Sequence, residues 1–339
     1  MVDATHKSFD ASDRSHHAIL KREVQRLAIA AQFTEKRRAE LDIVVAEITS
    51  NFYKHAKGGE VLAGCFREDG LVYVELIGVD QGPGMTDLNR MMADGYSTKN
   101  TLGHGLGSIK RLADTFDIFS LKDWGTVLLA RIFRDGKPVA GTPRRHTQIR
   151  PVVVAKPKEM HSGDGYYATC SDRYTKIILA DGLGHGIEAN IATNEAINAF
   201  KECPHLSPVE IIRFIHPQVR KTRGLVATIV VIDDHLKQLH IAGVGNISAR
   251  LVGATHSRSP ISYNGIIGHN IPGTMRDQVF DFDAYQQLIL CSDGIQSRWD
   301  LNQIAALMRH DLSVQAAAVY KEFGRRTDDM AVLIARFIP

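Results

Sequence analysis

Three glycines at alternate positions, Gly103, Gly105 and Gly107, constrain the fold of this 339-residue chain more than any other feature of its sequence. Glycine has no Cβ, so a loop made of it lets backbone N–H groups come close to an anion. The apolar residues from Leu106 to position 113 recur at helical spacing, which predicts a helix directly after the loop. The positive end of such a helix attracts phosphate. The sequence therefore predicts a nucleotide-binding site in this segment.

A second short motif lies upstream of the glycine loop, where an apolar run over 71–79 ends on Asp80. Turn residues join this run to the one over 60–67, which is typical of a β-hairpin. A carboxylate at a strand end, held by a turn that contains Gly82 and Gly84, can accept a hydrogen bond from the exocyclic amine of adenine. The same residues also fit an ordinary tight turn.

The span between the two motifs is polar and begins with Ser97, Thr98 and Lys99. We expect this span to fold over a bound triphosphate as a lid. The elements around it are predicted as one linking helix and two closing strands, over 88–92, 115–121 and 126–133.

A first helix is predicted over 15–31, and a second helix, over 34–56, carries Glu47 and Asn51. These two residues share a face because they are one helical turn apart. The amide oxygen of Asn51 is a suitable ligand for Mg²⁺, and the carboxylate of Glu47 can accept a proton from a water or a hydroxyl group. Such a pair alone is more often surface decoration. Its importance rests on the nucleotide motifs that follow it in the chain.

Length and charge limit the classes of function. A chain of 339 residues predicts two domains, each large enough for its own core. The formal net charge of +3 is nearly balanced, so we expect neither nucleic acid nor a membrane surface as a partner. The four cysteines are far apart and predict buried thiols in a reducing compartment. Without a bilayer-length apolar run or a signal-peptide pattern, the sequence predicts a cytoplasmic protein.

The stretch over 134–150 is rich in glycine, proline and charged residues, which indicates a linker between domains at 1–133 and 151–339. In the second domain, short runs of β-forming residues alternate with turns, and helices are grouped between them. This order predicts a β-sandwich flanked by helices. The strands are expected over 152–155, 165–170, 174–180, 225–232, 238–242, 247–252, 287–291 and 330–337, and the helices over 185–202, 208–219 and 314–323.

Aspartates stand at the predicted strand ends of the second domain: Asp164, Asp181, Asp293 and the adjacent pair Asp328 and Asp329. Carboxylates with no histidine or thiolate partner make an oxygen-rich site, which suits Mg²⁺ or Mn²⁺ better than zinc. Two such ions can share a hydroxide that attacks phosphorus in line. Each aspartate alone fits a turn, but together they predict metal-dependent phosphate hydrolysis.

Four elements of the first domain resemble, in order and spacing, the nucleotide-binding motifs of the GHKL ATPase and kinase superfamily. They are Glu47-x-x-x-Asn51, Asp80-x-Gly82-x-Gly84, the loop from Gly103 to Gly107, and Gly125-Thr126. Within this superfamily, residues 95–114 look like the anti-sigma-factor serine/threonine kinases of the RsbT/RsbW type. The resemblance implies a Bergerat-type α/β sandwich that binds ATP with Mg²⁺. It implies Glu47 as the base for the substrate hydroxyl, Asn51 as the Mg²⁺ ligand, Asp80 at adenine, and Gly105 and Gly107 at phosphate, with Leu106, Thr126 and the lid residues also at the nucleotide.

Four motifs of the second domain, SGD, DGLGHG, SDG and DDM, resemble those of the metal-dependent PPM phosphatases, specifically the bacterial SpoIIE/RsbX group. The resemblance implies two Mn²⁺ or Mg²⁺ ions. The ligands that it implies are Asp164, Asp181, the Gly182 carbonyl, Asp293 and one of the pair Asp328 and Asp329. Two departures are Ala168-Thr169, where the family often has an aspartate, and Ala331, where it often has a threonine. They remove no ligand, and the choice between Asp328 and Asp329 stays open.

The fold class expected from these patterns is α+β with two domains, a GHKL α/β sandwich followed by a PPM-type β-sandwich flanked by helices. The expected function is that of a regulatory protein that phosphorylates a serine or threonine on a partner and also removes such a phosphate. By resemblance, the partner is a STAS-type anti-sigma antagonist or a stressosome-like protein, and a homodimer is possible. Two alternatives stay open: a phosphatase regulated by an ATP-sensing domain without kinase activity, and a first domain that sequesters a partner in a nucleotide-dependent way.

Overall fold

The computed structural model describes residues 5–11, 14–56, 58–68, 70–85, 105–137, 147–253, 255–297 and 306–338. The chain divides into two compact units. The first unit consists of residues 1–142 together with 301–318, and the second of residues 143–300 together with 319–339. Nothing in the sequence pattern predicts that the chain returns to the first unit after residue 300. The domain boundaries at 133 and 150 stay predictions.

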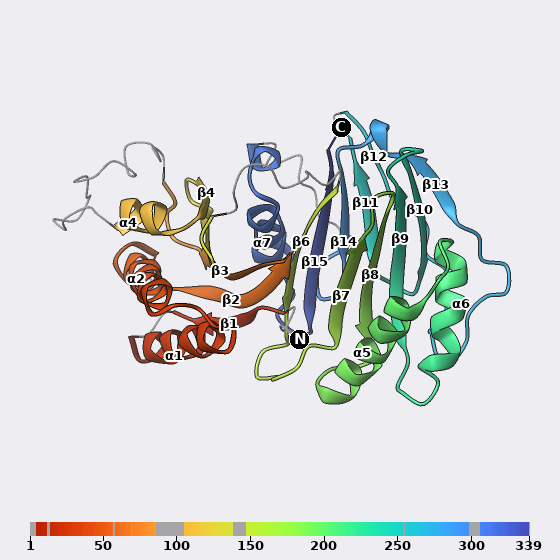
Figure 1. Ribbon diagram of the computed structural model, residues 1–339, viewed down its shortest axis with the longest axis horizontal. Coiled ribbons are helices and arrows are strands. Elements are labelled where there is room, and N and C mark those ends of the chain that lie inside the picture. Colours follow the sequence, from red (N-terminus) through yellow and green to blue (C-terminus); the bar gives the residue numbers. More distant parts are fainter. Residues whose placement is uncertain are drawn as a thin grey trace. The chain divides into compact units, whose positions relative to one another are not determined.

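The first unit is built on one five-stranded antiparallel sheet in the order β1-β2-β3-β5-β4. Its strands are β1 (Lys7–Asp10), β2 (Gly59–Glu68), β3 (Leu71–Asp80), β4 (Thr115–Leu121) and β5 (Gly125–Phe133). Its helices are α1 (Arg14–Ala30), α2 (Glu35–Asn51) and α4 (Gly105–Leu112), and a π-helical turn over Phe52–Ala56 continues α2 (Figure 1). The predicted elements are confirmed, whereas β1 and the π turn are not among them. The linking helix expected over 88–92 lies outside the described residues.

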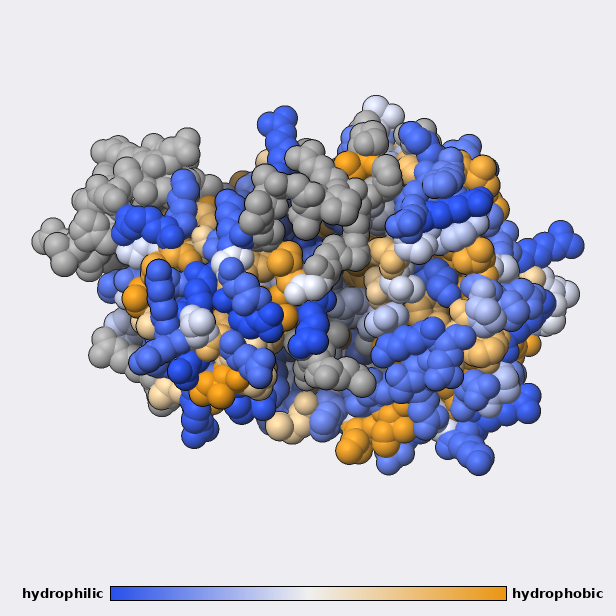
Figure 2. Space-filling view, in the orientation of Figure 1, coloured by the Kyte–Doolittle hydropathy of each residue, from blue (hydrophilic) through white to orange (hydrophobic). Residues whose placement is uncertain are grey.

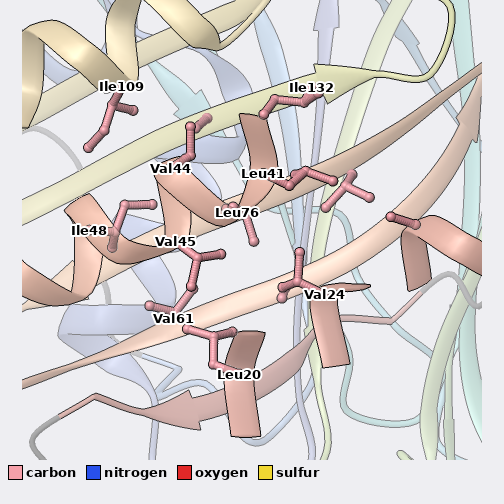
Figure 3. Close-up of a cluster of buried hydrophobic side chains, with 14 of the residues drawn as sticks. Leu20, Val24, Leu41, Val44, Val45, Ile48, Val61, Leu76, Ile109 and Ile132 are labelled. Carbon is pink, nitrogen blue, oxygen red and sulfur yellow. The ribbon is translucent and has the colours of Figure 1, made fainter. Parts of the chain in front are cut away.

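The helices of the first unit pack on one face of this sheet. Figure 3 shows Leu20 and Val24 of α1 and Leu41 and Ile48 of α2 among side chains of the strands, and each of these four is at most 1% exposed. Burial of aliphatic side chains on both elements stabilises the layer by roughly 1.5–3 kcal/mol per side chain. This packing fixes α2 against the strands, so the residues at its C-terminal end have defined positions.

The second unit is a β-sandwich of two five-stranded sheets, in the orders β13-β10-β9-β8-β7 and β12-β11-β14-β15-β6. Apolar side chains of both sheets form the core between them. A second apolar cluster lies between the first of these sheets and its two covering helices, α5 (Ile187–Glu202) and α6 (Pro208–Gln218) (Figure 1). The strands are β6 (Thr147–Val154), β7 (Asp164–Cys170), β8 (Tyr174–Gly182), β9 (Leu225–Asp233), β10 (Gln238–Val244), β11 (Ser248–Val252), β12 (Ser257–Arg258), β13 (Gln278–Asp281), β14 (Gln287–Cys291) and β15 (Met330–Phe337), with a short 3-10 turn at Phe282–Ala284.

The β-sandwich flanked by helices is confirmed, and so are its predicted strands and helices, with shifts of a few residues at their ends. The short strands β12 and β13 are additions. The strand β6 begins at Thr147, inside the stretch expected as a linker. The last helix, α7 (Leu312–Phe323), starts among residues of the first unit and ends among residues of the second.

Hydrophilic residues cover most of the surface in the view of Figure 2, and hydrophobic residues occur there in small groups. Examples of exposed hydrophobic side chains are Ile187 and Met160, which are 59% and 78% exposed. In the described part of the chain, no helix is long and apolar enough to cross a bilayer.

Candidate nucleotide and metal sites

The side chains of Glu47 and Asn51 both point at the first residue of α4. A Cβ built on Gly105 would lie 3.0 Å from Glu47 Oε2 and 3.2 Å from Asn51 Oδ1, so a side chain at this position would crowd both groups. The shared face predicted for the two residues is therefore confirmed. The Nδ2 atom of Asn51 is buried and has no hydrogen-bond partner among the described residues. An unpaired buried amide is costly, so this group needs a hydrogen-bond acceptor other than the described residues.

The helix α4 begins where these two side chains meet. Its first residue is Gly105, and the N–H groups of a first helical turn have no partners within the helix. Gly107 is buried, and Leu106 packs at the edge of the apolar core. The helix predicted after the glycine loop is therefore present and begins at Gly105. Of the other predicted nucleotide residues, Ser97, Thr98, Lys99 and Gly103 lie outside the described residues.

Asp80 and Thr126 form a directly opposed pair where β3 ends and β5 begins. The carboxylate of Asp80 accepts a hydrogen bond of 2.7 Å from Gly82 N, and both Asp80 and Thr126 are buried. Gly84 follows with a φ of +69°, and a Cβ there would lie 1.8 Å from Leu121 O, so only glycine fits the turn. These residues therefore lie together at the ends of two neighbouring strands.

Sequence reasoning does not find Ser120 on β4. Its hydroxyl lies 3.0 Å from Thr126 Oγ1, donates to Gly125 O and accepts from Met85 N. This buried hydroxyl links the end of β4 to the turn after Asp80. A single serine in a strand carries no sequence signal for such a role.

In the second unit, Asp164 at the start of β7 is directly opposite Asp181 near the end of β8. Asp164 Oδ2 accepts a hydrogen bond of 2.6 Å from Ser292 Oγ, and Ser292 Oγ in turn accepts one from Ala331 N. Asp164 Oδ1 is buried and has no partner among the described residues. A buried carboxylate oxygen left without a donor is suited to bind a cation.

The two neighbouring aspartates before β15 differ in their hydrogen bonds. Asp329 is 3% exposed and accepts bonds from Lys156 N at 2.8 Å and Gly163 N at 2.9 Å, one on each oxygen. Asp328 is half-buried, and its Oδ1 accepts from Asp329 N at 2.9 Å. These backbone N–H groups hold Asp329 between two loops and occupy both of its oxygens. Asp328 accepts fewer hydrogen bonds from the described residues, so its carboxylate has more capacity to bind a cation.

Burial and neighbouring negative charges raise the pKa values of Asp164 and Asp181. Burial, followed by the negative charge of Asp181, holds the pKa of Asp164 well above its ordinary value. Burial and the charges of Asp293, Asp328 and Asp329 raise the pKa of Asp181 to about 8. Like charges that are both buried and close together are unfavourable unless a cation neutralises them.

The chemistry of these residues suits a divalent cation. Among the described residues, no three carboxylate, imidazole or thiol groups converge closely enough to enclose an ion by themselves. Mg²⁺ keeps several of its waters in protein sites, so a few carboxylates suffice to hold it. The unpaired Asp164 Oδ1, the oxygen-only donors and the mutual repulsion of the aspartates match that kind of site. Asp293 is steadied by Asn246, whose Nδ2 donates to its Oδ2 at 2.9 Å.

The loop after Asp181 is shaped by glycines and bordered by charged side chains. A Cβ on Gly182 would lie 2.2 Å from Ala189 O, so α5 packs directly on this residue. His185 Nδ1 lies 2.9 Å from Glu159 Oε1. The exposed side chain of Arg223 reaches the same loop, because its Nη1 is 3.0 Å from the Cβ position of Gly184. Among the described residues, no carboxylate pairs with this guanidinium.

Two family models match the chain, one over its first part and one over its second part. Residues 9–132 match the family model of the histidine kinase-like ATPase domain, and residues 171–338 match that of stage II sporulation protein E, SpoIIE. The serine/threonine-protein kinase RsbT of Bacillus subtilis (strain 168) is 34% identical over 93 residues, which are 27% of this chain and 70% of that protein.

Two solved structures are similar to parts of the chain. One comes from work on "The bacterial stressosome: a modular system that has been adapted to control secondary messenger signaling", and it is 28% identical with a TM-score of 0.53, over 57% of this chain and 100% of the other. The other is RsbX in complex with magnesium, which is 20% identical with a TM-score of 0.50, over 58% of this chain and 98% of the other. At this level of identity, the similarity to RsbX shows only a shared fold.

Proposed function

The chain belongs to the family of the serine/threonine-protein kinase RsbT, here joined to a SpoIIE-type phosphatase domain, and from this premise we propose that one polypeptide both phosphorylates a regulatory protein and dephosphorylates it. The nucleotide unit supplies the first activity and the sandwich unit the second. The observation that carries the proposal most is the intact pair Glu47 and Asn51, converging on the N-terminus of α4. A domain that only sensed ATP would not need the carboxylate of Glu47.

In the kinase reaction, Asp80 would accept a hydrogen bond from adenine, and the first turn of α4 from Gly105 would donate to the phosphates. Asn51 would hold Mg²⁺ through its amide oxygen, and that ion would neutralise phosphate charge. Glu47 would take the proton of the attacking serine or threonine hydroxyl. The γ-phosphoryl group would pass to that oxygen, and ADP would leave. The residues between 97 and 103 are proposed as the lid over the triphosphate.

In the phosphatase reaction, the metal ligands would be Asp164, Asp181, the Gly182 carbonyl, Asp293 and Asp328. The bound ions would supply a hydroxide and neutralise the phosphate oxygens. We assign Asp329 to bracing rather than to ligation, because both its oxygens already accept backbone hydrogen bonds. Arg223 would bind the phosphate group of the substrate, because its guanidinium reaches the loop of Asp181 and, within the described part of the chain, has no carboxylate partner of its own.

The proposed target is a phosphorylatable regulatory protein of the STAS type. Support comes from the similarity to RsbT and from the similarity to a structure from work on the bacterial stressosome. Both magnesium and manganese suit the oxygen ligands of the second unit. A cytoplasmic location and a homodimer stay predictions.

A transfer assay with labelled ATP and a purified STAS-type protein tests the kinase half. We expect Glu47→Gln to lower transfer of label by about 100-fold or more, because the general base is lost, while ATP still binds. The matched control is Glu35→Gln, which changes an exposed carboxylate on the same helix. Unchanged transfer by Glu47→Gln would remove the kinase assignment. Nucleotide-dependent capture of the partner without any transfer by the wild type would favour the sequestering alternative.

A further inference from the structure

Ser292 directly follows β14 in the second unit, and two hydrogen bonds hold it against β15. Its backbone N donates to Ala331 O at 3.0 Å, and its hydroxyl oxygen accepts from Ala331 N at 2.9 Å. The residue is buried, with 2% of its surface exposed. A serine hydroxyl has one hydrogen to donate. The two bonds to Ala331 fix where the hydroxyl oxygen lies, and they leave that hydrogen for a different acceptor.

The acceptor is the carboxylate of Asp164. Ser292 Oγ donates to Asp164 Oδ2 at 2.6 Å, a length typical of a bond from a hydroxyl to an ionised carboxylate. The other oxygen, Asp164 Oδ1, is buried and has no hydrogen-bond partner among the described residues. A carboxylate that is held through one oxygen presents its second oxygen in a defined direction. Ser292 therefore determines which oxygen of Asp164 is left to bind a cation.

This bond joins the two sheets of the sandwich at the end where the aspartates lie. Asp164 begins β7 in one sheet, whereas β14 and β15 are neighbours in the other sheet. Asp293 comes directly after Ser292, and Asp328 lies two residues before β15. The proposed ligands thus come from both sheets, and their relative positions depend on contacts between the sheets. The bond from Ser292 to Asp164 is such a contact, and it is made by a ligand itself.

A serine hydroxyl that is bonded to a carboxylate can also act as a nucleophile. Two observations argue against this role for Ser292. The residue is only 2% exposed, so a phosphoprotein does not reach its hydroxyl oxygen. That oxygen also accepts a hydrogen bond from Ala331 N, which engages a lone pair that a nucleophile needs. The contacts of Ser292 suit a residue that positions a ligand.

We propose that Ser292 is a positioning residue of the metal site, whose hydroxyl orients Asp164 so that Oδ1 faces the cation and holds Asp164 in register with Asp293. This inference rests on the proposed function for the presence of a metal ion. Loss of a group that hydrogen-bonds to a metal ligand typically weakens metal binding by about 10–100-fold. Ser292 should therefore affect the affinity for metal although it does not contact the ion.

Titration of the full chain with Mn²⁺ tests this role without any assay of phosphate release. The signal of free Mn²⁺ in electron paramagnetic resonance measures the Kd. We expect Ser292→Ala to raise the Kd for Mn²⁺ by about tenfold or more, because Asp164 loses the donor that orients it. Ser292→Thr keeps the hydroxyl and should stay within about threefold of the wild type.

The matched control is Ser248→Ala. Ser248 lies on the neighbouring strand β11, and its hydroxyl donates to the backbone oxygen of Cys291 at 3.4 Å. This variant should bind Mn²⁺ like the wild type. Urea unfolding in EDTA checks that each variant is folded. If Ser292→Ala does not fold, Ser292→Cys keeps a side chain of similar size with a weaker donor, and it should raise the Kd by about threefold or more.

The outcomes separate this inference from the proposed function. A hydroxyl that only stabilised the fold would lower the urea midpoint of Ser292→Ala in EDTA and leave the Kd of the folded protein for Mn²⁺ unchanged. That result would overturn the positioning role alone. Equal losses of affinity in Ser292→Ala and Ser292→Thr would overturn it as well, since the hydroxyl would not be the cause. Absence of Mn²⁺ binding by the wild type would overturn the metal site and the positioning role together.

Discussion

Asp164 and Asp181 lie directly opposite each other where β7 begins and β8 nears its end. Two carboxylates in register on neighbouring strands repel each other, and burial increases that repulsion. One oxygen of Asp164 has no hydrogen-bond partner among the described residues. A divalent cation accounts for all three facts, because it supplies the charge that the pair lacks.

Replacement of Asp164 by asparagine separates the effect of this pair on stability from its role in metal binding. We expect Asp164→Asn to stabilise the metal-free protein by about 1 kcal/mol, because one of two like charges is removed. The same change should abolish stabilisation by Mn²⁺ and lower Mn²⁺-dependent release of phosphate by about 100-fold or more. Thermal unfolding in EDTA and in Mn²⁺ measures the first two effects. Asp172→Asn, in the exposed turn between β7 and β8, is the control. Equal stabilisation of both variants by Mn²⁺ would contradict the metal site.

Arg223 provides a test of substrate binding that leaves the metal ligands intact. We expect Arg223→Ala to raise the KM for a phosphoprotein about tenfold, with little change in kcat, because a charge-assisted bond to phosphate is lost. Arg223→Lys should recover part of the affinity. The concentration of Mn²⁺ needed for half-maximal rate should stay the same. The control is Arg220→Ala, which alters an exposed arginine two residues after the end of α6. An unchanged KM would show that Arg223 does not contact substrate.

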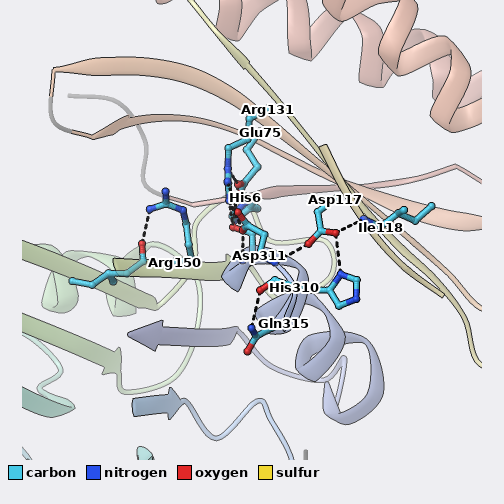
Figure 4. A network of polar contacts seen from close by, with 11 residues as sticks. His6, Glu75, Asp117, Ile118, Arg131, Arg150, His310, Asp311 and Gln315 are labelled. Atoms are coloured by element: carbon cyan, nitrogen blue, oxygen red, sulfur yellow. Dashed lines mark hydrogen bonds and ion pairs between the residues drawn. The ribbon is translucent and has the colours of Figure 1, made fainter. Parts of the chain in front are cut away.

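Arg131 and Arg134 lie three residues apart, but we expect their replacement to affect stability very differently. Figure 4 shows Arg131 in a network with Glu75 and Asp311, to which its guanidinium donates hydrogen bonds. Arg131→Met leaves the buried carboxylate of Glu75 and the partly buried one of Asp311 without their cation, and it should lower the free energy of unfolding by about 3 kcal/mol or more. Arg134→Met removes an exposed ion pair with Asp135 and should leave the urea midpoint nearly unchanged, because solvent screens such a pair. Urea unfolding of the two variants measures the difference. Similar midpoints for both would mean that the network contributes no more than a surface pair.

The acid sensitivity of the second unit should include a contribution from Asp233. A hydrogen bond from Arg173 lowers the pKa of Asp233 to about 2, below its unfolded value. A group whose pKa is lowered by folding stabilises the protein above its unfolded pKa, and this stability is lost as the pH falls toward the folded pKa. We therefore expect Asp233→Asn to be less stable than the wild type by about 1 kcal/mol at about pH 6, and by less at about pH 3. A pH-independent difference in urea midpoints would contradict the assignment.

Apolar periodicity was sufficient to predict most helices and strands, because local packing decides those elements. The motifs also located Asp80, Asp164 and Asp181 at strand ends. The network of Arg131 and Asp311 is different, because it joins residues 180 positions apart and its members look like ordinary surface charges in the sequence. The bracing of Asp329 by backbone N–H groups is equally invisible, since every residue type except proline offers the same donor. Long-range polar contacts of this kind appear only in the folded chain.

The central claim is that opposed phosphoryl-transfer activities share one polypeptide, and a single time course tests it most directly. The full chain is incubated with labelled ATP and a STAS-type protein, ATP is then removed enzymatically, and Mn²⁺ is added. We predict that label on the partner rises in the first stage and falls in the second, and that Asp181→Ala allows the rise but not the fall. A partner that is never labelled, or label that persists with the wild type after Mn²⁺ is added, would contradict the account.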